Sequence, residues 1–321
     1  ISAGDSNAAL LSFFARVNYD YDNKYLLSLS IRRDESSKFH KDNRVGYFPS
    51  VSAGWNVHQE KWFQNPVMSK LKIRASYGEL GANFLNPYNF DAIAYGPIPY
   101  TVGGERYVTG RAAYLKSKDL KWETAKTTDI GIELGFFNND LTLSLDYFVK
   151  KNVDLLAQID LNLSSGQIFE INSSREKPYV NTASVKNTGW EFMMNYRKQL
   201  TKDFHIDATF NIATLKNKVL SLGENVQPIT SGAMSSYFND AASITMPGEA
   251  IGSFYGYKID GVYASQHEIN EQGLTEVLGQ KIASIRPGDY RFRDQNGDGR
   301  RGGGRRDGGR AAGRRASPMP P

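Results

Sequence analysis

The chain has 321 residues, no cysteine, 18 Tyr and 17 Phe, and a formal net charge of +5. The absence of cysteine excludes thiolate metal sites and a disulfide scaffold. The positive charge is concentrated in residues 300–321, where seven Arg and one Asp give +6 and leave −1 for the rest of the chain. Nucleic-acid-binding proteins spread Lys and Arg over a folded face, so we expect no nucleic-acid partner.

Eight segments alternate apolar and polar side chains with a period of two, which predicts β-strands. In chain order they cover residues 13–21, 25–32, 47–57, 71–77, 129–136, 141–153, 190–197 and 204–216. The alternation is clearest after Leu141, where Leu143, Leu145 and Tyr147 face away from Thr142 and Ser144. Each segment therefore has one apolar and one polar face.

The connections between these segments alternate between short and long. Residues 22–24, 58–70, 138–140 and 200–203 form the short set, and residues 35–46, 79–121, 154–186 and 217–289 form the long set. Bacterial outer-membrane barrels have short periplasmic turns and long extracellular loops. The mean hydropathy of -0.49 is compatible with this class, because a barrel strand is apolar on only one face. The pattern predicts an all-β, antiparallel transmembrane barrel with long extracellular loops.

Six consecutive blocks of the sequence resemble landmarks of one transporter family. The blocks are FARVNYDYDNKYLLSLSIRRDESSKF, VGYFPSVSAGWNV, LKIRASYGELG, LKWETAKTTDIGIELGFFNNDLTLSLDYFVKKNVDLL, SVKNTGWEF and IGSFYGYKIDGVY. They are similar to the middle and late barrel of SusC/RagA-type TonB-dependent outer-membrane transporters. The resemblance implies a partial barrel of about 8–9 strands out of about 22. Residues 1–299 would form this part of the barrel domain, and residues 300–321 a low-complexity Arg/Gly/Pro tail that is disordered or non-native.

The same resemblance implies a location and a set of partners. The intact transporter would be integral to the bacterial outer membrane, contact its lipid bilayer, and import oligosaccharides or peptides. A SusD-like surface lipoprotein would capture the substrate, and the TonB complex would supply energy through an N-terminal region that has no counterpart in this sequence. Two alternatives stay open: a structural or adhesive barrel without transport, and a soluble all-β glycan-binding module.

The long connection at residues 79–121 carries candidate ligand-binding aromatics. They are Tyr88, Phe90, Tyr95, Tyr100 and Tyr107. Aromatic faces can stack on a sugar ring while nearby amides bond its hydroxyls. The alternative interpretation is that these side chains pack the loops against one another.

A second aromatic group includes the candidate partner-binding residues Phe254, Tyr255 and Tyr257, with Tyr263 nearby. An exposed cluster of this kind would suit a partner protein. Folding onto the barrel rim explains the same residues equally well.

Asp294, Asn296 and Asp298 are spaced like the first half of a calcium-binding loop. Arg305 stands where that loop needs a bidentate carboxylate, so the pattern is incomplete. Calcium is the one cofactor that the sequence suggests, and a polar turn explains the same residues. No catalytic residues are predicted, because the four His show no metal spacing and no nucleophile or phosphate-loop motif occurs. We therefore expect that the chain is not an enzyme.

Two further groups have mainly structural interpretations. Trp55, Trp62, Trp122 and Trp190 are expected at the level of the lipid headgroups. The charged residues of the polar faces are expected to pair across strands. They are Arg16, Arg74, Asp129, Glu133, Asp146, Glu191 and Arg197.

Overall fold

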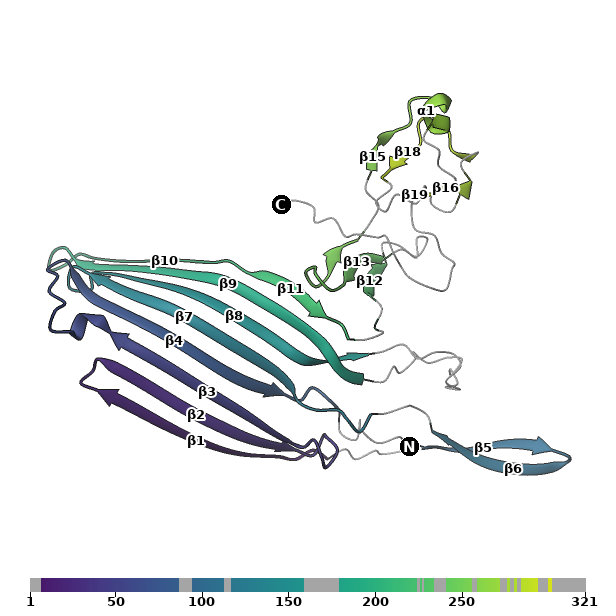
Figure 1. Cartoon of the computed structure of the whole chain (residues 1–321), viewed down its shortest axis with the longest axis horizontal. Helices are drawn as coiled ribbons and strands as arrows, with labels where there is room; N and C mark the ends of the chain where they lie inside the picture. Colours follow the sequence, from purple (N-terminus) through teal and green to yellow (C-terminus); the bar gives the residue numbers. More distant parts are fainter. Residues whose placement is uncertain are drawn as a thin grey trace. The chain divides into compact units, whose positions relative to one another are not determined.

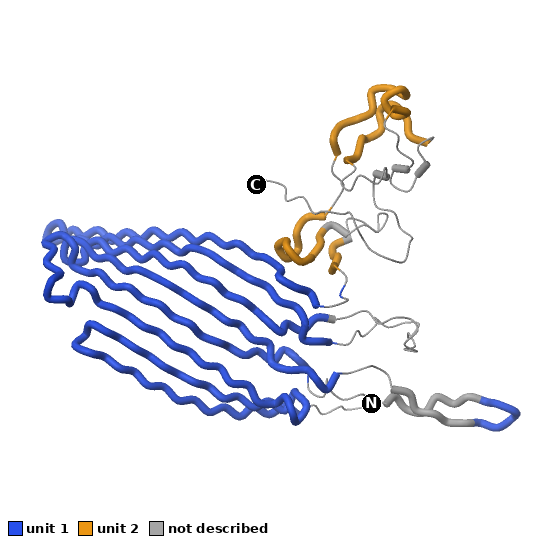
Figure 2. The backbone as a smooth tube through the Cα atoms, viewed as in Figure 1, with its two compact units in different colours: residues 1–227 blue, residues 228–321 orange. Residues whose placement is uncertain are grey.

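The computed structural model describes residues 7–86, 94–112, 117–158, 179–223, 226, 228–233, 241–255, 259–271, 276–277, 280–281, 284–293 and 300–301. The chain divides into two compact units, residues 1–227 and residues 228–321 (Figure 2). The first unit contains all eight predicted strands. The boundary expected at residue 300 stays a prediction, since residues 302–321 lie outside the described residues.

Unit 1 is built on one antiparallel sheet of nine strands (Figure 1). Its order is β1-β2-β3-β4-β7-β8-β9-β10, with β11 also paired to β9. The strands are β1 (Leu10–Tyr21), β2 (Tyr25–Ser36), β3 (Val45–Asn56), β4 (Met68–Ala82), β7 (Glu123–Phe136), β8 (Leu141–Gln158), β9 (Tyr179–Gln199), β10 (His205–Ala213) and β11 (Lys216–Ser221). Among the described residues the sheet is open, with β1 at one edge. The predicted partial barrel wall is thus confirmed.

The short connections lie at one end of the sheet and the long ones at the other (Figure 1). Asp22 and Asn23 both have positive φ, which suits the tight hairpin between β1 and β2. The Asp20 Oδ1 accepts the Asn23 amide at 2.8 Å and fixes this turn. Phe137, Asn138 and Asn139 also have positive φ between β7 and β8. These turns place successive strands side by side without a crossover.

One face of the sheet is apolar from β1 to β10, because cross-strand partners share a face. The registers Val17↔Leu29 and Leu29↔Val51 continue this face across the first three strands. The face is exposed or half-exposed throughout, with Val17, Leu29, Val51, Ile73, Ile132, Leu145, Phe192 and Ile212 as its central residues. In water such a continuous apolar surface would be unfavourable.

The opposite face is polar, and parts of it are more buried than the apolar one. Asp34, Ser36 and Asp146 are all buried on this side. The hydroxyls of Ser30 and Ser50 lie 2.6 Å apart between β2 and β3. A sheet that exposes aliphatic side chains and shelters carboxylates has the polarity of a membrane barrel, whose outer face meets lipid.

β10 and β11 behave as one strand with a short interruption. Ala213 pairs with Glu191, and Lys216 pairs with Thr188, so both follow β9 in the same register. Between them the Thr214 amide donates to the Trp190 carbonyl at 2.8 Å. The side-chain faces therefore continue from β10 into β11.

The long connection between β4 and β7 contains a hairpin that the sequence reading missed. β5 (Ala94–Val102) and β6 (Glu105–Ala112) pair antiparallel. Gly103 and Gly104 form the two-residue turn, with φ of 62° and 84°. Left-handed conformations at both positions favour glycine, and the Gly-Gly pair was the signal for this hairpin.

Unit 2 shows that residues 217–289 are more than the single long loop that was predicted. It contains β12 (Ile229–Ala233), β13 (Ala241–Thr245), β14 (Ser253–Phe254), β15 (Ile259–Val262), α1 (Gln266–Glu271), β16 (Glu276–Val277), β17 (Gln280–Lys281), β18 (Tyr290–Phe292) and β19 (Arg300–Arg301). Tyr263, Ile269 and Ile285 form its core, with Phe292 packed against them. Among the described residues, no helix has the length and apolar character needed to cross a membrane.

Candidate functional site

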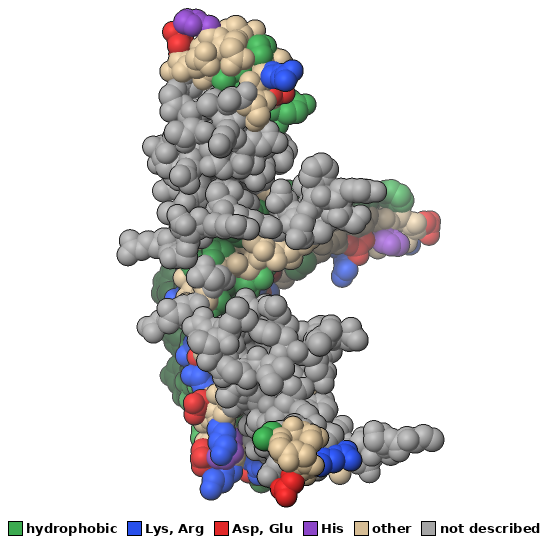
Figure 3. Space-filling model, turned by 90° about the vertical axis from the view of Figure 1, so that its right-hand side faces the viewer, with side chains coloured by type: hydrophobic (Ala, Val, Ile, Leu, Met, Phe, Trp, Pro, Cys, Tyr) green, Lys and Arg blue, Asp and Glu red, His purple; other side chains and the backbone are tan. Residues whose placement is uncertain are grey.

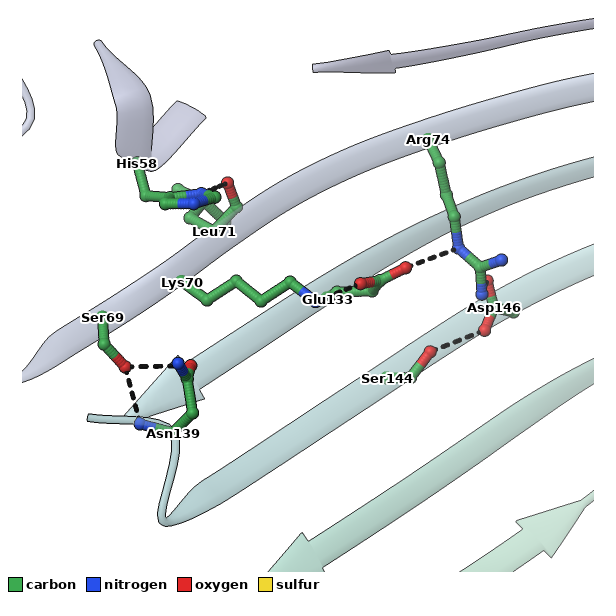
Figure 4. A network of polar contacts seen from close by, with 9 residues as sticks. All are labelled: His58, Ser69, Lys70, Leu71, Arg74, Glu133, Asn139, Ser144 and Asp146. Atoms are coloured by element: carbon green, nitrogen blue, oxygen red, sulfur yellow. Dashed lines mark hydrogen bonds and ion pairs between the residues drawn. The ribbon is translucent and has the colours of Figure 1, made fainter. Parts of the chain in front are cut away.

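The polar face of unit 1 carries a charged network on β4, β7 and β8 (Figure 4). Lys70 Nζ lies 2.7 Å from Glu133 Oε2, and Arg74 Nη2 lies 2.7 Å from Asp146 Oδ1. The Ser144 hydroxyl donates to the other Asp146 oxygen at 2.9 Å. The expected pairing of Arg74, Glu133 and Asp146 is confirmed. Arg197 also pairs as expected, with Asp207.

Arg74 and Asp146 belong to strands that are not neighbours, because β7 runs between them. The register places Gly131 opposite both residues. A Cβ on Gly131 would lie 1.9 Å from Asp146 Oδ1 and 2.9 Å from Arg74 Nε. The missing side chain therefore makes the space in which the ion pair crosses β7.

Arg74 Nε is the least well bonded polar atom of this network. It is buried and lacks a hydrogen-bond partner in the described structure. Glu133 Oε1 lies 3.5 Å away, close enough for an ion pair but at the limit of hydrogen bonding. The guanidinium is thus held mainly through Nη2, and its position depends on Asp146.

We expect Gly131→Ala to destabilise the folded sheet by about 2 kcal/mol. The new Cβ displaces Asp146 or Arg74 and separates the pair. Breaking a fully buried pair costs roughly 3–5 kcal/mol, and the 40% exposure of the Arg74 side chain reduces that cost. Urea unfolding of the protein in lipid vesicles measures the change.

The matched control is the same substitution in an Arg74→Ala/Asp146→Ala background. There Gly131→Ala has no long side chain to displace and should cost little. An equal cost in both backgrounds would show that the ion pair is not the reason for glycine at this position.

The long connections pack together at the other end of the sheet. Phe39, Phe48, Leu85, Leu120 and Trp122 form one buried cluster at their bases. The Trp122 ring lies 5.2 Å from the Phe39 ring and 5.6 Å from the Phe48 ring, and its indole N–H donates to the Arg44 carbonyl at 2.9 Å. Figure 3 views the chain from this end, where side chains of both charges lie beside hydrophobic ones.

This cluster corrects the expectation for Trp122. The residue is only 7% exposed, so it is a packing residue and not a member of a headgroup belt. Its position just before β7 resembled that of an interfacial Trp in sequence, and only the contacts distinguish the two. The bases of the long connections are thus held together by packing, while both interpretations of the aromatics at Tyr88, Phe90, Tyr95, Tyr100 and Tyr107 stay predictions.

The end with the short turns carries an aromatic group joined to a carboxylate. The Tyr25 and Trp55 rings stack at 6.3 Å, on the apolar face. The Tyr25 hydroxyl and the Trp55 indole N–H both donate to Glu60 Oε1, at 2.7 and 3.1 Å. These two donors, Tyr25 first, hold the pKa of the Glu60 carboxyl below its usual value. Trp55 therefore lies where an interfacial ring is expected.

The Glu60 contacts predict a loss of stability in acid. A carboxyl whose folded-state pKa is lowered stabilises the fold above its unfolded pKa of about 4.3, and this contribution disappears as the pH falls through the folded value. We expect Glu60→Gln to lower the melting temperature at pH 7 but not near pH 3. Thermal unfolding of both proteins across this range is the measurement. A difference that persists unchanged in acid would contradict the assignment.

The candidate ligand-binding aromatics divide between the β5–β6 hairpin and residues that lie outside the described part of the chain. Tyr88 and Phe90 lie outside the described residues. Tyr95 and Tyr100 fall in β5 and Tyr107 in β6, where the backbone register pairs Tyr100 with Tyr107. The hairpin thus brings two of the candidates to opposite positions on one short ribbon.

The candidate partner residues differ in their placement. Phe254 lies in β14 and is 69% exposed, as a contact residue would be. Tyr255 is half-buried, and Tyr257 lies outside the described residues. Tyr263 is buried in the core of unit 2, which removes it from any exposed aromatic surface.

The calcium pattern stays a prediction. Asp294, Asn296 and Asp298 lie outside the described residues. Within the part of the chain that is described, no group of three or more His, Cys, Asp or Glu could hold a metal ion.

Comparison with known proteins agrees with a sheet whose apolar face is exposed and whose polar face is partly buried. A family model for the TonB dependent receptor-like β-barrel matches residues 2–264. The chain belongs to this family. TonB-dependent receptor P3 of Formosa agariphila is 35% identical over 292 residues, which cover 90% of this chain and 28% of that receptor. TonB-dependent receptor SusC of Bacteroides thetaiotaomicron is 31% identical over 302 residues, which cover 90% and 27%.

Solved structures agree on the fold of this TonB-dependent receptor barrel. The structure of the RagAB peptide transporter matches with a TM-score of 0.65 and 24% identity, over 84% of this chain and 27% of the other. The receptor is of the SusC/RagA type and lies in the bacterial outer membrane. This location excludes the soluble glycan-binding module. The chain spans little more than a quarter of the curated relatives that it matches.

Proposed function

We propose that this chain forms part of the wall of an outer-membrane importer for oligosaccharides or peptides. The observation that supports this most is the polarity of the sheet in unit 1. Its aliphatic face is exposed across eight strands, whereas the Lys70, Arg74, Glu133 and Asp146 network lies on the opposite face. A wall of this kind separates lipid from an aqueous interior through which a polar solute can pass.

The proposal includes the energy source and the partner. TonB would drive import, and a SusD-like surface lipoprotein would deliver the substrate from outside. SusC is named as a TonB-dependent receptor, and the RagAB neighbour is described as a peptide transporter. Receptors of this family are generally not enzymes, so the bond-breaking chemistry would belong to other proteins.

Uptake by cells that carry the complete receptor tests this function. Labelled oligosaccharides and peptides are supplied to the parent strain, to a strain without TonB and to one without the adjacent surface lipoprotein. We expect uptake of one substrate class to require both TonB and the lipoprotein. Binding at the cell surface with no TonB-dependent uptake of either class would favour the adhesive or structural barrel instead.

A further inference from the structure

A row of lysines crosses the apolar face of the sheet in unit 1, near the end with the long connections. Lys126 on β7 pairs with Lys151 on β8, Lys151 pairs with Lys186 on β9, and Lys186 pairs with Lys218 on β11. Strands lie about 4.8 Å apart, so the row extends over about 14 Å. Four adjacent strands therefore present the same charge at the same register position. We call Lys126, Lys151, Lys186 and Lys218 the lysine row.

The lysine row lies on the outward face of the sheet. Residues two apart on a strand share a face, so Lys151 lies on the side of Leu145 and Val149. The same register joins Leu145 to Ile132 and to Phe192, on the strands of Lys126 and Lys186. The row thus continues the lipid-facing surface and does not belong to the polar interior.

The height of the row matches the edge of the bilayer core. Lys151 comes ten residues after Leu141, the first residue of β8. At about 3.3 Å per residue this is about 33 Å along the strand, or about 25 Å across the membrane at a tilt of about 40°. An outward apolar band of about 25 Å is what a barrel of this kind requires. The lysines therefore end the band at the level of the outer headgroups.

The four lysines of the row have one acidic partner among their ion pairs in the described residues. Lys126 pairs with Glu79 at 3.2 Å. Among the ion pairs of the described residues, none includes Lys151, Lys186 or Lys218. Like charges directly opposite each other on paired strands repel. An anion held between them would remove this repulsion.

We propose that the lysine row binds the phosphate groups of a phosphorylated glycolipid in the outer leaflet. The position of the row selects a lipid over other anions. The next outward positions below the row are Thr128, Val149, Thr188 and Lys216, and the apolar band starts below them with Ile130, Tyr147 and Trp190. The acyl chains would contact this band, while the phosphates meet ammonium groups that extend toward the headgroups. A free anion would satisfy only the second contact. The proposal rests on the outer-membrane location of the family and does not depend on what the receptor imports.

The test compares two double variants of the complete receptor in detergent micelles. Lys151→Gln/Lys218→Gln removes two charges from the row. Lys61→Gln/Lys202→Gln removes two exposed charges from the connections at the opposite end of the sheet. The probe is fluorescent lipid A with its phosphates, and the same lipid after enzymatic dephosphorylation.

We expect the row variant to bind phosphorylated lipid A about 30-fold more weakly than the wild type, since each lysine near an anionic lipid surface changes affinity about fivefold. The single variant Lys186→Gln should show about a fivefold loss. The control variant should bind like the wild type, dephosphorylated lipid should bind all four proteins equally weakly, and substrate uptake should be unchanged. Heat-modifiable migration on gels confirms that each variant is folded.

Several results would overturn the proposal. Wild-type affinity in the row variant would show that the lysines do not contact the lipid. Equal binding of the dephosphorylated lipid by the wild type would leave only apolar contact. Displacement of the lipid by excess inorganic phosphate would show that the row binds a free anion. An equal loss of lipid affinity in the Lys61→Gln/Lys202→Gln control would show that only the net charge of the protein matters. Loss of uptake in a row variant that binds lipid like the wild type would assign the lysines to import and would also overturn the proposal.

Discussion

Replacing Trp122 with alanine is expected to destabilise the receptor by about 3–5 kcal/mol, the cost of removing a large buried aromatic side chain. Trp122 is 7% exposed and contacts both Phe39 and Phe48. Its removal would leave a cavity at the bases of the long connections and take one of two hydrogen bonds from the Arg44 carbonyl, which would keep only the Ser36 amide as donor. Urea unfolding in lipid vesicles measures the loss, and protease cleavage of these connections should become faster.

Two variants make this prediction specific. Trp122→Phe keeps a ring but loses the hydrogen bond to Arg44, so we expect a smaller cost of about 1–2 kcal/mol. Trp62→Ala is the matched control, because Trp62 is 66% exposed and contacts no buried cluster in the described structure. If Trp122→Ala were as mild as Trp62→Ala, the cluster would not hold the connections together.

Introducing arginine at Leu145 is expected to cost about 2–4 kcal/mol, the penalty for a charge on the lipid face near the midplane. Leu145 lies midway along the apolar part of β8, and its side chain is 41% exposed. In the bilayer that exposed area would meet hydrocarbon. The free energy of unfolding in vesicles is again the measurement, together with the yield of folded receptor in the outer membrane.

Thr142→Arg is the control on the same strand. Thr142 points to the polar face, where its register partners are Gly135 and Asn195, so a new charge there can remain hydrated. We expect little change in stability. Equal costs at Leu145 and Thr142 would mean that the two faces do not meet different solvents, and the assignment of the membrane face would then be wrong.

The sequence was sufficient to predict the strands, because period-two alternation and short polar turns are local signals. It also predicted that charged residues of the polar face would pair across strands, as Arg74, Glu133 and Asp146 do. It did not predict that Gly131 makes the gap between Arg74 and Asp146. That requirement appears only when β4, β7 and β8 are aligned.

Other features could not be predicted from the sequence, because they depend on contacts between residues that are far apart in the chain. Trp122 looked like an interfacial residue, and its burial depends on Phe39 and Phe48, which are distant in sequence. Gly103 and Gly104 are a local signal for the β5–β6 hairpin, but the strands beside them lack the regular apolar and polar alternation of the barrel strands. Tyr263 became a core residue of unit 2 through contacts with α1 and β18.

The amino-acid sequence alone determined that this chain makes amphipathic strands, in which order they follow, and which side of each is apolar. These properties depend on neighbours within a few residues, where alternation and turn chemistry act. The tertiary structure decided which side chains meet across strands, including the charged network and the lysine row. Register sets those contacts. Tight turns fix the register of the strands that they join, but β4 with β7 and β8 with β9 are joined by long connections, so their register is fixed only when the sheet assembles.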